Sequence, residues 1–281
     1  MEQLEKALAK AREQRAAKLA PTAGDQGQGR AAATNRGLSI SYQRTHVFST
    51  PREGLVRNRI VANDPGDERA EVYRVLRTRV LNHLTRAGKS TLGVTSAQSG
   101  EGKTVTAVNL AIAIAMDVNQ TVLLVDADLR APSVHRCFGV EPTVGLADYL
   151  LGQAEIADCF LNPGMDRIVL LPTRGNVSGS AELLASPQMA RLAQELKQRY
   201  PDRVIIYDLP PLLTTGDTIG FLSNLDSVLL VVRDGAVRAS DMKRTMELLA
   251  GQDLVGTVLN DADRPVDGAV GYGYYFGGRG G

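Results

Sequence analysis

The feature that most constrains this chain is a short glycine-containing loop, residues 97–104, with the sequence AQSGEGKT. It follows a strand-like run at 91–95 and opens a helix-like stretch at 103–118. Gly100 and Gly102 allow backbone N–H groups to turn inward around an anion. The helix N-terminus adds positive potential at the same place. A strand, this loop and a helix in this order predict a phosphate-binding loop of the Walker A type.

The loop also predicts the ligand. Lys103 is expected to reach the β- and γ-phosphates of ATP, and the Thr104 hydroxyl is expected to ligate Mg²⁺. ATP and Mg²⁺ are therefore the expected cofactors. The residues expected to contact the nucleotide are Ser99, Gly100, Glu101, Gly102, Lys103, Thr104 and Val105.

Carboxylates end two other strand-like runs. Asp126 and Asp128 lie at the end of the run at 121–126, and Asp208 ends the run at 204–208. Ligands of open α/β sheets bind at the carboxyl ends of the strands, so all three carboxylates are expected to face the loop. There they can bind metal-held water, accept a proton or ligate Mg²⁺ directly, as a Walker B aspartate does.

Two further polar residues have open roles. Arg130 either pairs with one of the neighbouring acids or contacts phosphate. Asn260 ends the last strand-like run, 254–260, and its amide either binds an adenine edge or simply terminates the strand.

Strand-like and helix-like stretches alternate from residue 90 onward. Several of the strand-like runs are continuously apolar, as expected for strands covered on both faces. The pattern predicts an α/β fold with a doubly wound, mostly parallel sheet. The expected strands are 91–95, 121–126, 167–172, 204–208, 227–232 and 254–260, and the expected helices are 103–118, 187–200 and 240–250.

The two ends differ from this central region. Residues 1–60 contain 11 Lys/Arg and 5 Asp/Glu, and no periodic pattern is evident at 20–60, so residues 1–62 are expected to form a poorly ordered basic arm. A domain at 63–262 follows, beginning with a helix from a cap signal at 65–67 to about residue 84. Residues 263–281 are rich in glycine and tyrosine and are expected to form a flexible tail. No apolar run is long enough to span a bilayer.

Three motifs together, TSAQSGEGKT, VLLVDADLRAP and IIYDLPP, resemble the bacterial tyrosine kinases of capsule and exopolysaccharide synthesis. These kinases belong to the deviant P-loop ATPases. The resemblance covers residues 64–275. It implies that Asp126 is the base for a tyrosine hydroxyl and that Asp128 is a metal ligand. It also implies that Glu71, Arg74 and Arg77, an ExxRxxR motif, mediate self-assembly.

The resemblance further implies autophosphorylation of a C-terminal cluster, here Tyr272, Tyr274 and Tyr275. The expected partners are other copies of the chain in a ring, a membrane polysaccharide copolymerase that activates the kinase, and a phosphotyrosine phosphatase. Nucleic acid is not expected as a partner. The expected location is cytoplasmic, at the inner face of the plasma membrane through that partner.

Two alternatives remain open on the sequence. One is an ATP-hydrolysing switch similar to the partitioning and septum-site ATPases, and the other is a catalytically weak regulatory subunit. Gln98 stands where the former carry a lysine that reaches across their dimer. This departure and the terminal tyrosines favour the kinase. The presence of Lys103 and of all the expected acids counts against the weak subunit.

Overall fold

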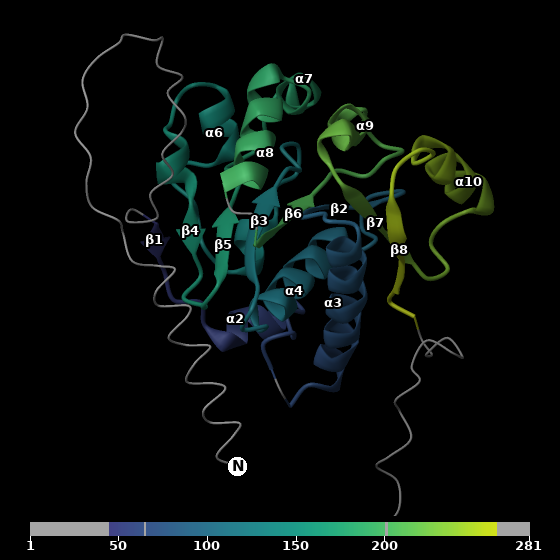
Figure 1. Ribbon diagram of the computed structural model, residues 1–281, viewed down its shortest axis with the longest axis horizontal. Helices are drawn as coiled ribbons and strands as arrows, with labels where there is room; N and C mark the ends of the chain where they lie inside the picture. Colours follow the sequence, from purple (N-terminus) through teal and green to yellow (C-terminus); the bar gives the residue numbers. More distant parts are fainter. Residues whose placement is uncertain (1–44, 65, 200–201, 263–281) are drawn as a thin grey trace, which may run out of the picture. The chain divides into compact units, whose positions relative to one another are not determined.

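The structure is a computed structural model that describes residues 45–64, 66–199 and 202–262. Within these residues the strands form one eight-stranded sheet in the order β1-β4-β5-β3-β6-β2-β7-β8 (Figure 1). Each neighbouring pair is parallel except β4 and β5, which are antiparallel. The predicted mostly parallel α/β sheet is therefore confirmed.

The six predicted strands are present within one or two residues of their expected bounds. The two-residue strands β1 and β4 were not predicted, because so short a segment shows no period. The strands are β1 (His46–Val47), β2 (Thr91–Ser96), β3 (Thr121–Asp126), β4 (Leu161–Asn162), β5 (Ile168–Leu171), β6 (Arg203–Asp208), β7 (Ser227–Arg233) and β8 (Leu254–Asn260).

The helix predicted from the cap signal at 65–67 is α3, and the Asp67 side chain accepts a hydrogen bond from the Arg69 amide at its start. The described α-helices are α2 (Arg52–Arg57), α3 (Glu68–Arg86), α4 (Lys103–Ala115), α5 (Val134–Cys137), α6 (Leu146–Leu150), α7 (Ser180–Leu184), α8 (Pro187–Arg199), α9 (Asp217–Phe221) and α10 (Ala239–Leu248), and the 3₁₀ helices are η2 (Ile156–Cys159) and η3 (Leu222–Asn224).

Alternation along the strands divides the core between the two faces of the sheet. Leu92, Leu124 and Ile206 belong to the cluster that packs under α4, and α3 lies beside α4 on that face (Figure 1). On β7, Val228 and Leu230 belong to another cluster. Successive side chains of a strand point to opposite faces of the sheet. Apolar residues at both odd and even positions of a strand therefore need other elements packed on both faces. The sheet is thus fixed from both sides, and its carboxyl edge remains free for a site.

The segment before α3 is a correction to the predicted basic arm. Residues 45–62 are part of the folded domain, with Leu55 and Ile60 buried in the main core. The side-chain oxygen of Asn109, on α4, accepts hydrogen bonds from the amides of residues 61 and 62 at 2.8 and 3.0 Å. The expected poorly ordered arm over residues 1–62 is therefore wrong for residues 45–62, because the tertiary contacts that order them leave no periodic pattern in the sequence.

Residues 1–44 and the tail lie outside the described residues. No helix in the described part of the chain is both long and apolar enough to cross a bilayer.

Replacing Leu55 with alanine is expected to lower the free energy of unfolding by about 2–5 kcal/mol, because the side chain is only 1% exposed. The adjacent Val56 is 48% exposed and is the matched control. Val56→Ala is expected to change the free energy by less than about 0.5 kcal/mol. Urea unfolding followed by circular dichroism measures both. Equally small effects would contradict the inclusion of residues 45–62 in the domain.

Candidate phosphate-binding and transfer site

The parallel sheet brings the predicted residues to one edge. β3 and β6 are neighbours, and their register places Asp126 opposite Asp208 at the carboxyl ends of the two strands. β2 lies between β6 and β7, and the loop at 97–102 leaves its end and leads into α4. Strand order therefore places these two carboxylates, 82 positions apart in the sequence, next to the loop.

The loop has the conformation that its glycines permit. Gly100 and Gly102 have φ of +82° and +90°, in the left-handed region that disfavours side chains. Gly102 immediately precedes the first residue of α4, so the loop ends at a helix N-terminus. Ser99 and Gly100 are exposed at the open side of the loop, and Val105 is partly buried against the main core. This arrangement presents backbone amides and a helix dipole to an anion.

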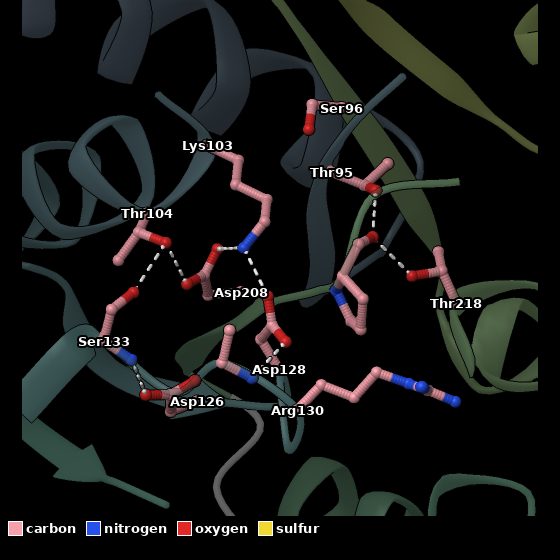
Figure 2. Close-up of polar contacts among 12 residues, drawn as sticks. Thr95, Ser96, Lys103, Thr104, Asp126, Asp128, Arg130, Ser133, Asp208 and Thr218 are labelled. Atoms are coloured by element: carbon pink, nitrogen blue, oxygen red, sulfur yellow. Dashed lines mark hydrogen bonds and ion pairs between the residues drawn. The ribbon is translucent and has the colours of Figure 1, made fainter. Parts of the chain in front are cut away.

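Lys103 is buried between two carboxylates (Figure 2). Its Nζ lies 2.7 Å from Oδ2 of Asp128 and 3.7 Å from Oδ1 of Asp208. Burial acts to lower the pKa of Lys103, but the charges of Asp208 and Asp128 outweigh it and raise the pKa. The ammonium group therefore stays charged, and it lies directly behind the phosphate-binding loop.

The Thr104 hydroxyl donates a hydrogen bond to Oδ2 of Asp208 at 2.6 Å. The Ser133 hydroxyl donates in turn to Oγ1 of Thr104 at 3.2 Å (Figure 2). Sequence reasoning linked Thr104 and Asp208 through a shared metal but missed Ser133. The only signal for Ser133 was its position seven residues after Asp126, inside the same strand-to-helix loop.

Asp126 is fully buried, and its two carboxylate oxygens differ in their hydrogen bonding. Oδ2 accepts hydrogen bonds from the amides of Ser133 and Val134, both at 3.0 Å. Oδ1 has no hydrogen-bond partner among the described residues, and the same holds for Oδ1 of Asp208. Burial, and secondly the charge of Asp208, raise the pKa of Asp126 well above its ordinary value. Burial also raises the pKa of Asp208, although Lys103 opposes the shift.

These donors fit a magnesium ion. Oδ1 of Asp208 is buried without a hydrogen-bond partner within the described residues, and the Thr104 hydroxyl donates to the other oxygen of the same carboxylate. Hard oxygen ligands of this kind suit Mg²⁺. No group of three or more His, Cys, Asp or Glu side chains in the described part of the chain could hold a metal alone. Mg²⁺ in nucleotide sites keeps several waters and takes phosphate oxygens as further ligands.

Arg130 pairs with neither neighbouring acid. Its Nε lies 3.3 Å from both carboxylate oxygens of Asp217, a buried residue at the start of α9. The Ser180 hydroxyl donates to the same carboxylate. Its partner lies 87 positions away along the chain, and no local pattern indicates it. Contact of Arg130 with phosphate stays a prediction.

The turn after Asp208 is held by two buried hydroxyls. Thr95 and Thr218 both donate to the carbonyl oxygen of Pro210, at 2.8 and 2.6 Å (Figure 2). A proline carbonyl still accepts hydrogen bonds although the residue has no N–H. This double contact fixes the chain directly beyond the Asp208 carboxylate.

The remaining predicted residues are placed as follows. Asn260 lies at the loop, where its amide donates to the Glu101 carbonyl at 2.9 Å. On α3, Arg74 pairs with Glu71 at 2.6 Å, whereas Arg77 donates to the Ala113 carbonyl near the end of α4. None of these three α3 residues makes a described contact to the phosphate site. The predicted acceptors Tyr272, Tyr274 and Tyr275 lie outside the described residues.

Replacing Asp126 with asparagine is expected to stabilise the nucleotide-free chain at pH 7 by about 1 kcal/mol. Because the folded pKa is raised above the unfolded value, the folded chain binds a proton that the unfolded chain releases. Stability of the wild type therefore falls as pH rises from about 4 toward the folded pKa. Asparagine does not titrate, so the variant avoids this loss of stability. The variant is therefore expected to be more stable than the wild type at pH 7 and equally stable near pH 4.

Thermal melts at the two pH values measure this effect. Asp166→Asn, at an exposed position, is the control and should change neither melt. A gain from Asp126→Asn that is equal at both pH values would contradict the electrostatic explanation.

Comparisons with known proteins agree with this geometry. A family model described as an AAA domain matches residues 90–248. Tyrosine-protein kinase YwqD of Bacillus subtilis is 34% identical over 224 residues, which cover 79% of this chain and 92% of YwqD. The kinase domain of Escherichia coli tyrosine kinase ETK matches with a TM-score of 0.68 and 29% identity, over 87% of this chain and 100% of that one.

A septum-site relative matches less of the chain. The septum site-determining protein MinD of Pyrococcus horikoshii, solved with Mg-ADP, has a TM-score of 0.51 and 25% identity, over 60% of this chain and 69% of that one. Its likeness supports a nucleotide-binding fold, and the longer, more similar matches are kinases. The chain therefore carries an AAA domain and belongs to the family of bacterial tyrosine-protein kinases.

Proposed function

We propose that this tyrosine-protein kinase is an autokinase that transfers the γ-phosphoryl group of ATP to its own C-terminal tyrosines. The observation that carries the proposal is the buried ion cluster of Lys103 with Asp128 and Asp208, directly behind the phosphate-binding loop. The phosphoryl-transferring domain is residues 45–262, and residues 263–281 are the acceptor segment. The acceptors are Tyr272, Tyr274 and Tyr275.

The chain's own groups position the nucleotide. Backbone amides of residues 99–105 cradle the phosphates, and Lys103 exchanges Asp128 for the β- and γ-phosphate oxygens. Asp128, Asp208 and the Thr104 hydroxyl would hold Mg²⁺. When bound, the ion offsets negative charge on the phosphoryl oxygens.

Transfer then needs little covalent chemistry from the protein. The tyrosine oxygen forms a bond to the γ-phosphorus, the bond from that phosphorus to the β–γ bridging oxygen breaks, and ADP leaves. The tyrosine proton passes to Asp126. A tyrosine hydroxyl has a pKa near 10, so a nearby acceptor helps, and the raised pKa of Asp126 makes its carboxylate a better base.

The same proposal includes regulated assembly. Glu71 and Arg74 on α3 form part of a charged seam between copies of the chain in a ring. Each phosphotyrosine adds about −1.5 to −2 charge, and the resulting repulsion loosens the ring. Cycling of this kind would control the chain length or export of a capsule or exopolysaccharide. A membrane copolymerase activates the kinase at the inner face of the plasma membrane, and a phosphotyrosine phosphatase resets it.

Lys103→Met is expected to abolish phosphorylation of the C-terminal tyrosines, because the variant lacks the cation that binds the transferred phosphate. Mass spectrometry of protein isolated from its own cells measures phosphotyrosine in the wild type and the variant. Native cells supply the membrane activator.

A wild type without phosphotyrosine that nonetheless binds and hydrolyses ATP would favour the switch function of the partitioning and septum-site ATPases. The residue at position 98 supports the kinase instead, because glutamine stands where those ATPases carry a lysine that reaches across their dimer.

Assembly has a separate test. A Glu71→Ala, Arg74→Ala double variant is expected to shift the nucleotide-bound chain from oligomer to monomer without changing its melting temperature. Arg77 is left intact because its bond to the Ala113 carbonyl stabilises the fold itself. Arg79→Ala, at an exposed position on the same helix, is the control. Sedimentation velocity measures the mass, and an unchanged oligomer in the double variant would contradict the proposed seam.

A further inference from the structure

We propose that Asn260 is a positioning residue for the phosphates of the nucleotide, and that it acts by holding the phosphate-binding loop in shape. Its Nδ2 donates to the carbonyl oxygen of Glu101 at 2.9 Å. This role differs from recognition of an adenine edge, because it serves any ligand that carries the same phosphates. The inference rests on the proposed function in one respect, which is that ATP binds at this loop.

The contact is close enough to restrict the sequence of the loop. A Cβ atom placed on Gly102 would lie 2.0 Å from Nδ2 of Asn260. Gly102 also has φ of +90°, so a side chain is disfavoured there for a second reason. The Asn260 amide therefore occupies the space that a side chain at Gly102 would need. The two residues are matched to each other across 158 positions of sequence.

Asn260 is itself held in place by the neighbouring strand. It pairs with Arg233 in the register between β7 and β8. Its backbone carbonyl accepts a hydrogen bond from the backbone N–H of Asp234 at 2.9 Å. Glu101 is tied to the same strand end, because its buried carboxylate accepts the Arg233 amide at 3.3 Å. The other oxygen of that carboxylate accepts a hydrogen bond from the backbone N–H of Gln98. The loop is thus braced from the β7–β8 side by two separate contacts.

The hydrogen bond from Asn260 matters for phosphate binding because it controls the direction of the Glu101 carbonyl. Inward amides of the loop attract phosphate oxygens only if the carbonyls between them point away. The Nδ2 donor satisfies the Glu101 carbonyl and opposes rotation of the peptide between Glu101 and Gly102. Without it, that carbonyl loses its partner, and an inward rotation would bring it toward the phosphates.

The position of Asn260 also connects the phosphate-donor site with the proposed acceptor tyrosines along the chain. β8 ends at Asn260, and Tyr272 follows only twelve residues later. The strand that supports the donor phosphates therefore leads directly to the proposed acceptor tyrosines.

The experiment compares ligands with and without a base. Isothermal titration calorimetry measures the affinity of the full chain for ATP, GTP and inorganic tripolyphosphate, each with Mg²⁺. The variants are Asn260→Ala, Asn260→Asp and, as a control, Asn119→Ala at an exposed turn. Asn260→Asp keeps the size of the side chain, so it tests the donor even if the alanine variant folds poorly.

Asn260→Ala is expected to lower the affinity for all three ligands by a similar factor of about three to ten, which is the range for one net hydrogen bond. Asn260→Asp should weaken them at least as much, because a carboxylate donates nothing and repels the Glu101 carbonyl. Loss of ATP affinity alone would assign Asn260 to the base and overturn the inference, as would unchanged affinity for tripolyphosphate. A wild-type chain that binds none of the ligands would instead overturn the proposed function.

Discussion

The site depends on one electrostatic arrangement, the Lys103 ammonium buried against the carboxylates of Asp128 and Asp208. Three aspartates close together in a buried place repel one another, and desolvation adds to their cost. Lys103 offsets only part of this, since burial and neighbouring charge still leave the pKa of Asp126 raised. The site therefore concentrates negative charge that a magnesium ion can offset.

The parallel sheet is what makes so concentrated a charge possible. Strand order places the ends of β3, β6 and β2 side by side, while the packed faces on both sides hold the backbone rigid. The site is braced from its flanks as well. Thr95 and Thr218 fix the Pro210 carbonyl on one side of the loop, and Asn260 holds Glu101 on the other. Such pre-organisation lets binding proceed with little reordering of the protein.

The elements that the sequence predicted well are those with a strong local pattern. Strands such as β3 and β8 were bounded correctly because apolar runs end abruptly at Asp126 and Asn260. The segment at 45–62 was misassigned because its order comes from Asn109 and the main core, neither of which lies nearby in the sequence. Ser133 was missed for a similar reason, since a lone serine in a loop carries no signal until the fold places it beside Thr104.

The sequence by itself determined the fold class, the phosphate-binding loop, the acidic residues at the strand ends and the resemblance to tyrosine kinases. These follow from local rules, because glycine permits a left-handed turn and parallel strands share one carboxyl edge. Only the tertiary structure decided which partners the polar groups take. Arg130 pairs with Asp217 and Asn260 binds the Glu101 carbonyl. Such choices depend on distances between residues far apart along the chain, which are set by how helices and strands pack in three dimensions.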